Sequence, residues 1–246
     1  MSPVLPVAVW QCPPRSVLVA VDFGDASARA LAIGGVVASA FDARLGALHA
    51  ERFEPPPYFT LEQISELEAE RRAAQAATTD HLARFAAQAS GYPIESSVVD
   101  DTPVEAILNG AATADLIIAG THGRRGPGRW WLGSVAERIV RAATIPVLVT
   151  RAATTPPRAV FERIALVQDE EHVEPAARRY AERLATIAGG SVVEGGPVAR
   201  CEAGVMQQAT LVVMSTRSDR PSWGITDAVA RVLGTCQRPV LFIPTH

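Results

Sequence analysis

The chain has 246 residues, a formal net charge of −3 and a hydrophobic content of 48%. This composition is ordinary for a globular protein that buries a core, and the length fits one large domain or two small ones. The slight acidic excess argues against a nucleic-acid-binding protein, which normally shows a basic excess or a basic face. All 23 cationic residues are arginine, which excludes a Schiff-base lysine and a lysine-bearing phosphate loop.

Cysteine and histidine usage gives no sign of a disulfide framework or a metal site. The three cysteines are an odd number at scattered positions, and none of the five histidines lies at ligand spacing from another histidine or a cysteine. The chain shows no charged start followed by a long apolar run, and no stretch approaches the roughly 18 consecutive apolar residues of a membrane-spanning helix. We therefore expect a cytoplasmic protein that contacts neither nucleic acid nor membrane.

Short apolar, β-branched runs alternate with longer helix-like stretches between residues 16 and 150, which is typical of a parallel sheet covered by helices. Strands are predicted at Ser16–Asp22, Arg44–Ala50, Ile94–Val99, Asp115–Gly120 and Ile145–Thr150. Helices are predicted between them: one capped by Asp25 or Ser27 and ending near Phe41, a long one from a Thr60–Gln63 capping box to about Ser90, a short one opened by Thr102, Pro103 and Glu105, and one over Ser134–Ala143.

The pattern starts again after a linker at Thr154–Arg158. The predicted elements are then a strand, a helix and two more strands, at Arg163–Gln168, Glu174–Ala188, Thr210–Ser215 and Arg238–Ile243. The text LVVMSTRS repeats LIIAGTHG at an offset of 95 residues, and the second PVL triplet repeats the first at an offset of 93. We predict an α/β protein of two tandem domains, residues 1–152 and a reduced copy at residues 158–246, each a parallel sheet flanked by helices.

The segment from Ala119 to Val140 holds the residues most suited to bind a ligand. It begins at the carboxyl end of a predicted strand, where open α/β sheets bind ligands. Gly120 and Gly123 allow sharp turns whose N–H groups approach a ligand, and Gly133-Ser134 stands at a helix start, where unpaired N–H groups favour phosphate. Three arginines between these glycines, Arg124 among them, make the loop electropositive. Together these features predict a phosphate site.

Each of these features also has a structural reading. Ser134 with Glu137 forms a capping box, and many such boxes bind nothing. Glycines are common turn formers, and Asp22 at a strand end is a common loop cap. His122 can be a turn residue facing solvent. The Trp130-Trp131 pair can belong to a lid, an oligomer contact or ordinary packing.

The spacing Gly120-x2-Gly123-x9-Gly133-Ser134 resembles the nucleotide-binding signature of the universal stress protein family, G-x2-G-x9-G-[ST]. VLVAVDFGDASARAL at the first strand, LHA at the second and GSVAERIVRAATIPVLV at the end resemble the same family. The resemblance is strong over about residues 16–151 and weak over about residues 160–246. It implies an adenine-nucleotide-alpha-hydrolase-like fold with a five-stranded parallel sheet of order 3-2-1-4-5. It also implies ATP held across strands one and four, with Mg²⁺ on the nucleotide, in a protein that is often dimeric.

Carried over by position, the resemblance implies a role for each motif residue. Asp22 would accept from the adenine amino group, and Ala50 would line the adenine pocket. The residues facing the ribose and phosphates would be Ala119, Gly120, His122 and Gly123, beside Arg124. The backbone N–H groups that meet the β- and γ-phosphates would be those of Gly133, Ser134 and Val135. Two residues depart from the family pattern, Asp101, which could repel phosphate or help to hold a metal, and Ala20, which leaves the adenine floor less defined.

The second unit is predicted not to bind nucleotide. Ser215 and Ser218 replace the first two motif glycines, and Thr226-Asp227 replaces Gly133-Ser134, which puts a carboxylate where phosphate would lie. We expect an ATP-binding regulatory protein of the stress type, with slow hydrolysis or none, that acts on an unknown protein partner. The second unit would be an internal dimer partner, and a homodimer stays open. The alternatives are an interaction module without nucleotide and a nucleotidyl-transfer enzyme of related fold.

Overall fold

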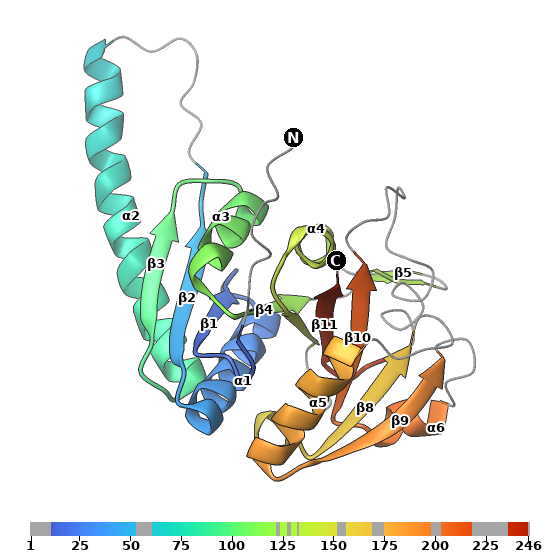
Figure 1. Cartoon of the computed structure of the whole chain (residues 1–246). Coiled ribbons are helices and arrows are strands. Elements are labelled where there is room, and N and C mark those ends of the chain that lie inside the picture. Colours follow the sequence, from blue (N-terminus) through green and yellow to red (C-terminus); the bar gives the residue numbers. More distant parts are fainter. Residues whose placement is uncertain are drawn as a thin grey trace, which may run out of the picture.

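The computed structural model describes residues 11–52, 61–121, 124–126, 129–131, 133–151, 156–168, 175–197, 203–217 and 236–245. Its main feature is one nine-stranded sheet of order β3-β2-β1-β4-β7-β11-β10-β8-β9 (Figure 1). The strands of the first half are β1 (Ser16–Ala20), β2 (Arg44–Ala50), β3 (Glu95–Val99), β4 (Leu116–Thr121) and β7 (Val147–Arg151). Their neighbours pair in parallel, so the predicted order 3-2-1-4-5 is confirmed.

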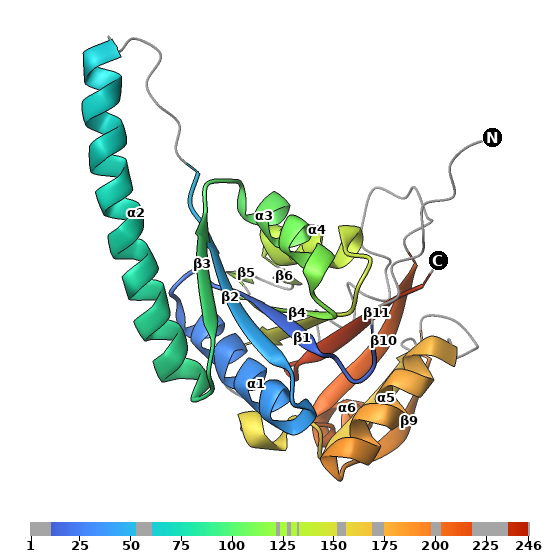
Figure 2. The ribbon, with the colours of Figure 1, turned by 60° about the vertical axis from the view of Figure 1, so that its left-hand side comes forward.

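Four helices of the first half cover the two faces of this sheet (Figure 2). They are α1 (Asp25–Phe41), α2 (Leu61–Ser90), α3 (Pro103–Gly110) and α4 (Ser134–Ala142). Leu31 of α1 lies in the core on one face, and Ile107 of α3 and Ile139 of α4 lie in the core on the other. Ile117 and Ile118 of β4 point to opposite cores with no exposed surface, because successive strand residues alternate and both faces are covered.

The helix starts differ from the sequence prediction. Gly24 is the N-cap of α1, and neither Asp25 nor Ser27 caps the helix; the Ser27 hydroxyl donates to the Gly24 carbonyl at 2.9 Å. Thr102 is the N-cap of α3 with Pro103 in the first turn, as predicted, but the Thr102 side chain makes no capping hydrogen bond. The backbone conformation and tertiary packing start these helices without a side-chain acceptor. The Thr60 half of the predicted capping box lies outside the described residues.

The second half adds β8 (Arg163–Gln168), α5 (Pro175–Ala188), β9 (Ser191–Pro197), α6 (Ala203–Gln208), β10 (Leu211–Arg217) and β11 (Val240–Thr245). Neither β9 nor α6 was predicted. The strand order β9-β8-β10-β11 in the second half corresponds to the order β2-β1-β4-β7 in the first half. Among the described residues, the elements that come after β9 in the chain are α6 and β10. The second half therefore has no described counterpart of α2 or β3, which explains its smaller size.

Backbone hydrogen bonds repeat between the halves at the amino ends of the strands. The Asp115 N–H donates to the Ser16 carbonyl at 2.8 Å, and the Thr210 N–H donates to the Arg163 carbonyl at 2.8 Å. Asp115 and Thr210 stand 95 residues apart, the offset found in the sequence. The side chains of both residues also accept backbone N–H groups: Asp115 from Gln11, Arg15 and Ser16, and Thr210 from Arg163.

The two halves join along β7 and β11, which pair antiparallel. Leu148 lies opposite Leu241, and both side chains are buried. The α5 residues Tyr180 and Leu184 belong to the same core as α1, so one apolar layer continues across the junction. Burial of this layer favours association of the halves into one sheet.

A short antiparallel pair lies between β4 and α4, formed by β5 (Arg124–Gly126) and β6 (Arg129–Trp131). The sequence predicted only a loop there. Within the described residues, no helix has the length and apolar character needed to cross a membrane.

Candidate functional site

The carboxyl ends of β1 and β4 lie side by side at one edge of the sheet. Ala20, the last residue of β1, is in register with Ala119 of β4, and Ala20 also pairs with Leu48 of β2. The predicted residues Asp22, Ala119 and Gly120 therefore come from neighbouring strand ends. Parallel strands place their carboxyl ends at the same edge, where backbone groups are available to a ligand.

The start of α4 faces this edge without a side-chain cap. Gly133, at φ −57° and ψ 147°, is the N-cap of α4, and a glycine has no side chain that could accept the first helical N–H groups. The Gly133 N–H donates to the Thr121 hydroxyl at 3.2 Å, which ties the helix start to the end of β4. Uncapped N–H groups and the helix dipole together make this position attractive to an anion.

The predicted capping box of Ser134 and Glu137 does not form. Ser134 is the first residue of the helix and not its cap, and its side chain is exposed. The Glu137 carboxylate instead forms an ion pair with Arg141 one turn later. The structural reading of this pair is therefore wrong, and the Ser134 hydroxyl is not used to begin the helix.

The glycines of the motif have different structural requirements. Gly120 lies inside β4 and not in a turn, which corrects the sequence reading. A methyl group on Gly120 would lie 2.4 Å from the carbonyl oxygen of Ala26, so close packing of β4 against α1 requires glycine there. At Gly133 the backbone has a negative φ, and an added methyl would meet the Thr121 hydroxyl at 3.6 Å, an ordinary contact. The described fold therefore does not require glycine at position 133.

Asp22 lies exposed two residues after the end of β1, and its carboxylate accepts the Gly24 N–H at 3.0 Å. This is the loop-cap role that Asp commonly has at strand ends. The carboxylate has a second oxygen with its own lone pairs, so the contact with Gly24 does not exhaust its capacity to accept hydrogen bonds. Asp22 thus combines a structural contact with exposure at the sheet edge.

The other predicted residues fall into three groups. Ala50, the last residue of β2, and Val135, in the first turn of α4, are both half-buried beside the core that contains Ile107 and Ile139. Arg124 begins β5, which fixes its backbone between β4 and α4. His122 and Gly123 lie outside the described residues. The role of each in binding stays a prediction.

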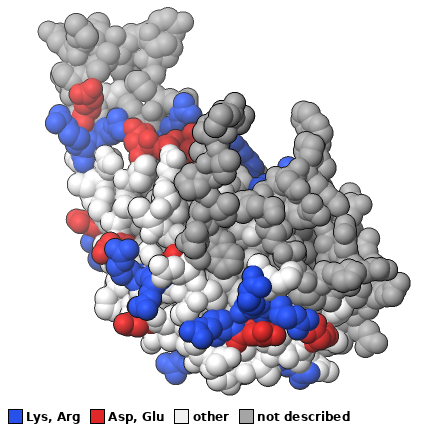
Figure 3. All heavy atoms as spheres, viewed as in Figure 1, with Lys and Arg blue, Asp and Glu red and all other residues white. Residues whose placement is uncertain are grey.

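Two charged residues near this edge contact other protein atoms. Asp101, which departs from the family pattern, accepts the Thr102 N–H at 2.6 Å. Arg151 at the end of β7 donates to the Cys236 carbonyl at 2.9 Å, and burial lowers the pKa of its guanidinium. In the second half, Figure 3 shows arginine and acidic side chains lying together over α5, where Arg178 pairs with Glu182 and Glu194.

Thr121 is the residue that sequence reasoning missed. Thr121 is only 3% exposed, and its hydroxyl accepts the Gly133 N–H. It lies between Gly120 and His122, which the sequence analysis did single out. The available signal was a hydroxyl residue closing a buried apolar strand, where an unpaired polar group would be costly. A buried hydroxyl at such a place needs a partner, and the partner here is the helix start.

Comparison with known proteins agrees with this architecture. Residues 14–151 match the universal stress protein family. A universal stress protein of Thermus aquaticus is 35% identical over 140 residues, which cover 56% of this chain and 98% of that protein. The crystal structure of a universal stress protein from Archaeoglobus fulgidus superposes on 94% of this chain and 98% of its own, with a TM-score of 0.69 and 16% identity, so the fold of the whole chain is shared.

One further solved universal stress protein is described as a complex with cAMP. It is 26% identical, covers 56% of this chain and 98% of its own, and has a TM-score of 0.42. The family match spans more than half of the 246 residues and contains β1, β2, β3, β4 and β7 together with the start of α4. This chain belongs to the universal stress protein family.

Proposed function

We propose that the protein is a regulatory ATP-binding protein in which the first half holds one nucleotide and the second half serves as an internal dimer partner. The bound nucleotide alters the surface that the protein offers to a partner protein. The observation that carries the proposal is the start of α4, which follows β4 at the sheet edge and has as its N-cap Gly133, a residue without a side-chain acceptor.

The phosphate end of the nucleotide is assigned to this helix start. The N–H groups of the first turn supply donors, and the exposed Ser134 hydroxyl can add another. Gly133 supports this assignment because neither φ nor the described packing requires a glycine, whereas close approach of a phosphate would. Thr121 keeps the donors fixed relative to β4.

The base end is assigned to the neighbouring ends of β1 and β2. Asp22 is exposed there and offers a carboxylate to the adenine amino group, and Ala50 offers a small half-buried surface. The register Ala20 to Ala119 sets these groups beside β4, so one ligand can span both ends of the site. Mg²⁺ would accompany the triphosphate and offset its charge.

The second half is assigned a structural role. Its Ser215 and Ser218 stand where the first half has Gly120 and Gly123, and Asp227 stands where the first half has Ser134. A carboxylate at a helix start satisfies its N–H groups and repels phosphate. The antiparallel pairing of β7 with β11 occupies the β7 edge and supports the view that the second half substitutes for another subunit.

The test places an aspartate at position 134 of the first half, the position equivalent to Asp227. Ser134→Asp is expected to weaken ATP binding by at least about tenfold, on the order of 1.4 kcal/mol, in calorimetric titrations with and without Mg²⁺. The melting temperature should stay the same or rise slightly, because an acidic residue in the first turn stabilises a helix. Loss of binding would then not reflect loss of folding.

A matched control adds the same charge elsewhere. Ala112 is exposed just before β4, at the opposite end of that strand, so Ala112→Asp should leave ATP affinity unchanged. The proposal fails if the wild-type chain shows no affinity for ATP. It also fails if Ser134→Asp binds ATP as tightly as the wild type does.

A further inference from the structure

The loop between β1 and α1 contains a residue in a strained backbone conformation. Phe23 has a φ of +61°, which lies in the left-handed region that bulky residues rarely adopt. It stands between Asp22 and Gly24, the two residues joined by the hydrogen bond from the Gly24 N–H to the Asp22 carboxylate. A conformation of this kind persists where the surroundings impose it, so the contacts of the Phe23 ring are informative.

Three aromatic side chains from two other elements surround the Phe23 ring. The His49 ring on β2 has its centroid 4.6 Å away, and the His81 ring on α2 has its centroid 4.7 Å away. Phe85, one helical turn after His81, adds an edge contact with centroids 5.6 Å apart. Aromatic pairs at these separations attract one another beyond simple burial. The ring of Phe23 is thus clamped between β2 and α2.

Hydrogen bonds from β2 fix the same loop on its other side. The Val21 N–H donates to the Leu48 carbonyl at 2.9 Å, and His49 Nδ1 lies 2.8 Å from the Val21 carbonyl oxygen. His49 therefore contacts the residue before Asp22 through a ring nitrogen, and its ring packs against the residue after Asp22. Asp22 itself stays exposed between these two fixed points.

We propose that Phe23, clamped by His49 and His81, is a positioning residue that sets the Asp22 carboxylate for an adenine base. This inference rests on the proposed nucleotide site and deepens it. Opposite position 6 of the base, a carboxylate accepts from the amino group of adenine but meets the carbonyl oxygen of guanine with repulsion, so an Asp22 fixed at that position selects adenine. Prior ordering of a binding group also lowers the entropic cost of binding.

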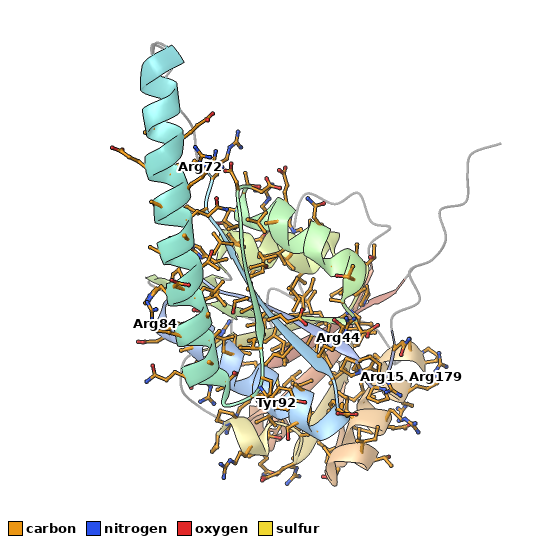
Figure 4. All side chains as sticks on the ribbon, turned by 90° about the vertical axis from the view of Figure 1, so that its left-hand side faces the viewer. Arg15, Arg44, Arg72, Arg84, Tyr92 and Arg179 are labelled. Atoms are coloured by element: carbon orange, nitrogen blue, oxygen red, sulfur yellow. The ribbon has the colours of Figure 1, made fainter. Side chains whose placement is uncertain are left out.

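The principal variant is Phe23→Gly, because glycine adopts a φ of +61° without strain and so removes the ring while permitting the backbone conformation. The second variant is His81→Ala, which removes an exposed ring that comes from α2 and not from the loop. Arg84→Ala is the matched control: Figure 4 shows Arg84 on the side of the same helix that points away from the strands. The full chain is titrated with ATP, GTP and inorganic tripolyphosphate.

For Phe23→Gly we expect ATP binding to weaken about tenfold, with a smaller loss in His81→Ala and none in Arg84→Ala. The preference for ATP over GTP should shrink in the first two variants, while tripolyphosphate, which probes only the phosphate end, should bind as in the wild type. Equal loss for ATP and tripolyphosphate would mean that the ring only supports the fold, and would overturn the inference.

Unchanged affinity and unchanged base preference in both ring variants would overturn it as well. These failures are distinct from failure of the proposed function, in which the wild-type chain itself would not bind ATP and the inference would fall with it. Melting temperatures of all four proteins accompany the titrations. A variant that loses base preference at an unchanged tripolyphosphate affinity supports the positioning role whatever its melting temperature.

Discussion

The two halves of the sheet agree at the amino ends of their strands and differ at the carboxyl ends. At the amino ends, Asp115 and Thr210 make the same backbone hydrogen bonds and accept equivalent strand amides through their side chains. At the carboxyl ends, β4 closes with Gly120-Thr121 and β10 reaches Ser215-Thr216. The shared hydrogen bonds lie at one edge of the sheet, whereas the proposed nucleotide site lies at the other edge. One half can keep the fold without keeping the site.

The largest expected effect on stability comes from a substitution in β4, at a position where the two halves differ. Gly120→Ser should lower the free energy of unfolding by about 3 kcal/mol, because the new side chain would begin 2.4 Å from the Ala26 carbonyl oxygen. The reverse change at the equivalent place, Ser215→Gly, should cost only about 0.5–1 kcal/mol, the usual cost of glycine within a strand. Urea denaturation of both variants measures the difference. Equal costs would show that α1 does not pack closely on β4.

The similarity of the two halves at the amino ends of their strands is tested by removing the polar side-chain groups of Asp115 and Thr210. Asp115→Ala should lower the free energy of unfolding by about 2 kcal/mol, because the carboxylate accepts three backbone N–H groups. Thr210→Val should cost about 1 kcal/mol, because its neutral hydroxyl accepts one backbone N–H, that of Arg163, and donates to the carbonyls of Val160 and Arg163. Thermal unfolding of the two variants provides the measurement. A larger loss in Thr210→Val than in Asp115→Ala would contradict the account.

A smaller effect is expected for the threonines at the carboxyl ends of β4 and β10, and it should differ between the two halves. Thr121→Val removes the acceptor of the Gly133 N–H, so stability should fall by about 1 kcal/mol and ATP binding should weaken about fivefold. Thr216 occupies the same place in the second half, 95 residues later. Thr216→Val should leave ATP binding unchanged in the same titrations. Equal weakening in both variants would argue against a site confined to the first half.

The smallest expected change in stability is at Gly133. Gly133→Ala should alter the free energy of unfolding by no more than about 0.5 kcal/mol, since φ is negative and the added methyl has room. ATP binding should nevertheless weaken, because the methyl would meet the phosphate. Chemical denaturation and calorimetry on the same preparation test both parts. Full ATP affinity in this variant would remove the argument that a ligand explains the glycine.

Much of the fold followed from pattern alone. Continuous apolar runs such as the one that became β4 predict buried parallel strands, and the repeated texts at offsets of 95 and 93 residues predicted β10 and β11. The strand β9 was missed because its sequence, SVVEGGP, ends in glycines and a proline that favour a loop. Pairing with β8 overrides that local preference.

The site could be predicted only in outline. The spacing of the glycines placed the predicted site at the carboxyl edge of the sheet, but the reason for glycine at position 120 is a tertiary contact that a single sequence does not contain. Gly120 is required by Ala26, nearly a hundred residues earlier, and Gly133 is held by Thr121. The contacts of Phe23 likewise join the loop after β1 to His49 on β2 and to His81 on α2. Contacts between distant residues account for what the motif could not predict.

The central claim is that the first half alone holds nucleotide, and the stoichiometry of binding tests it most directly. Native mass spectrometry of the full chain with ATP should give at most one nucleotide per chain for the wild type, and a lower occupied fraction for Ser134→Asp at the same ATP concentration. Two nucleotides per chain, or an equal occupied fraction in Ser134→Asp, would contradict the account.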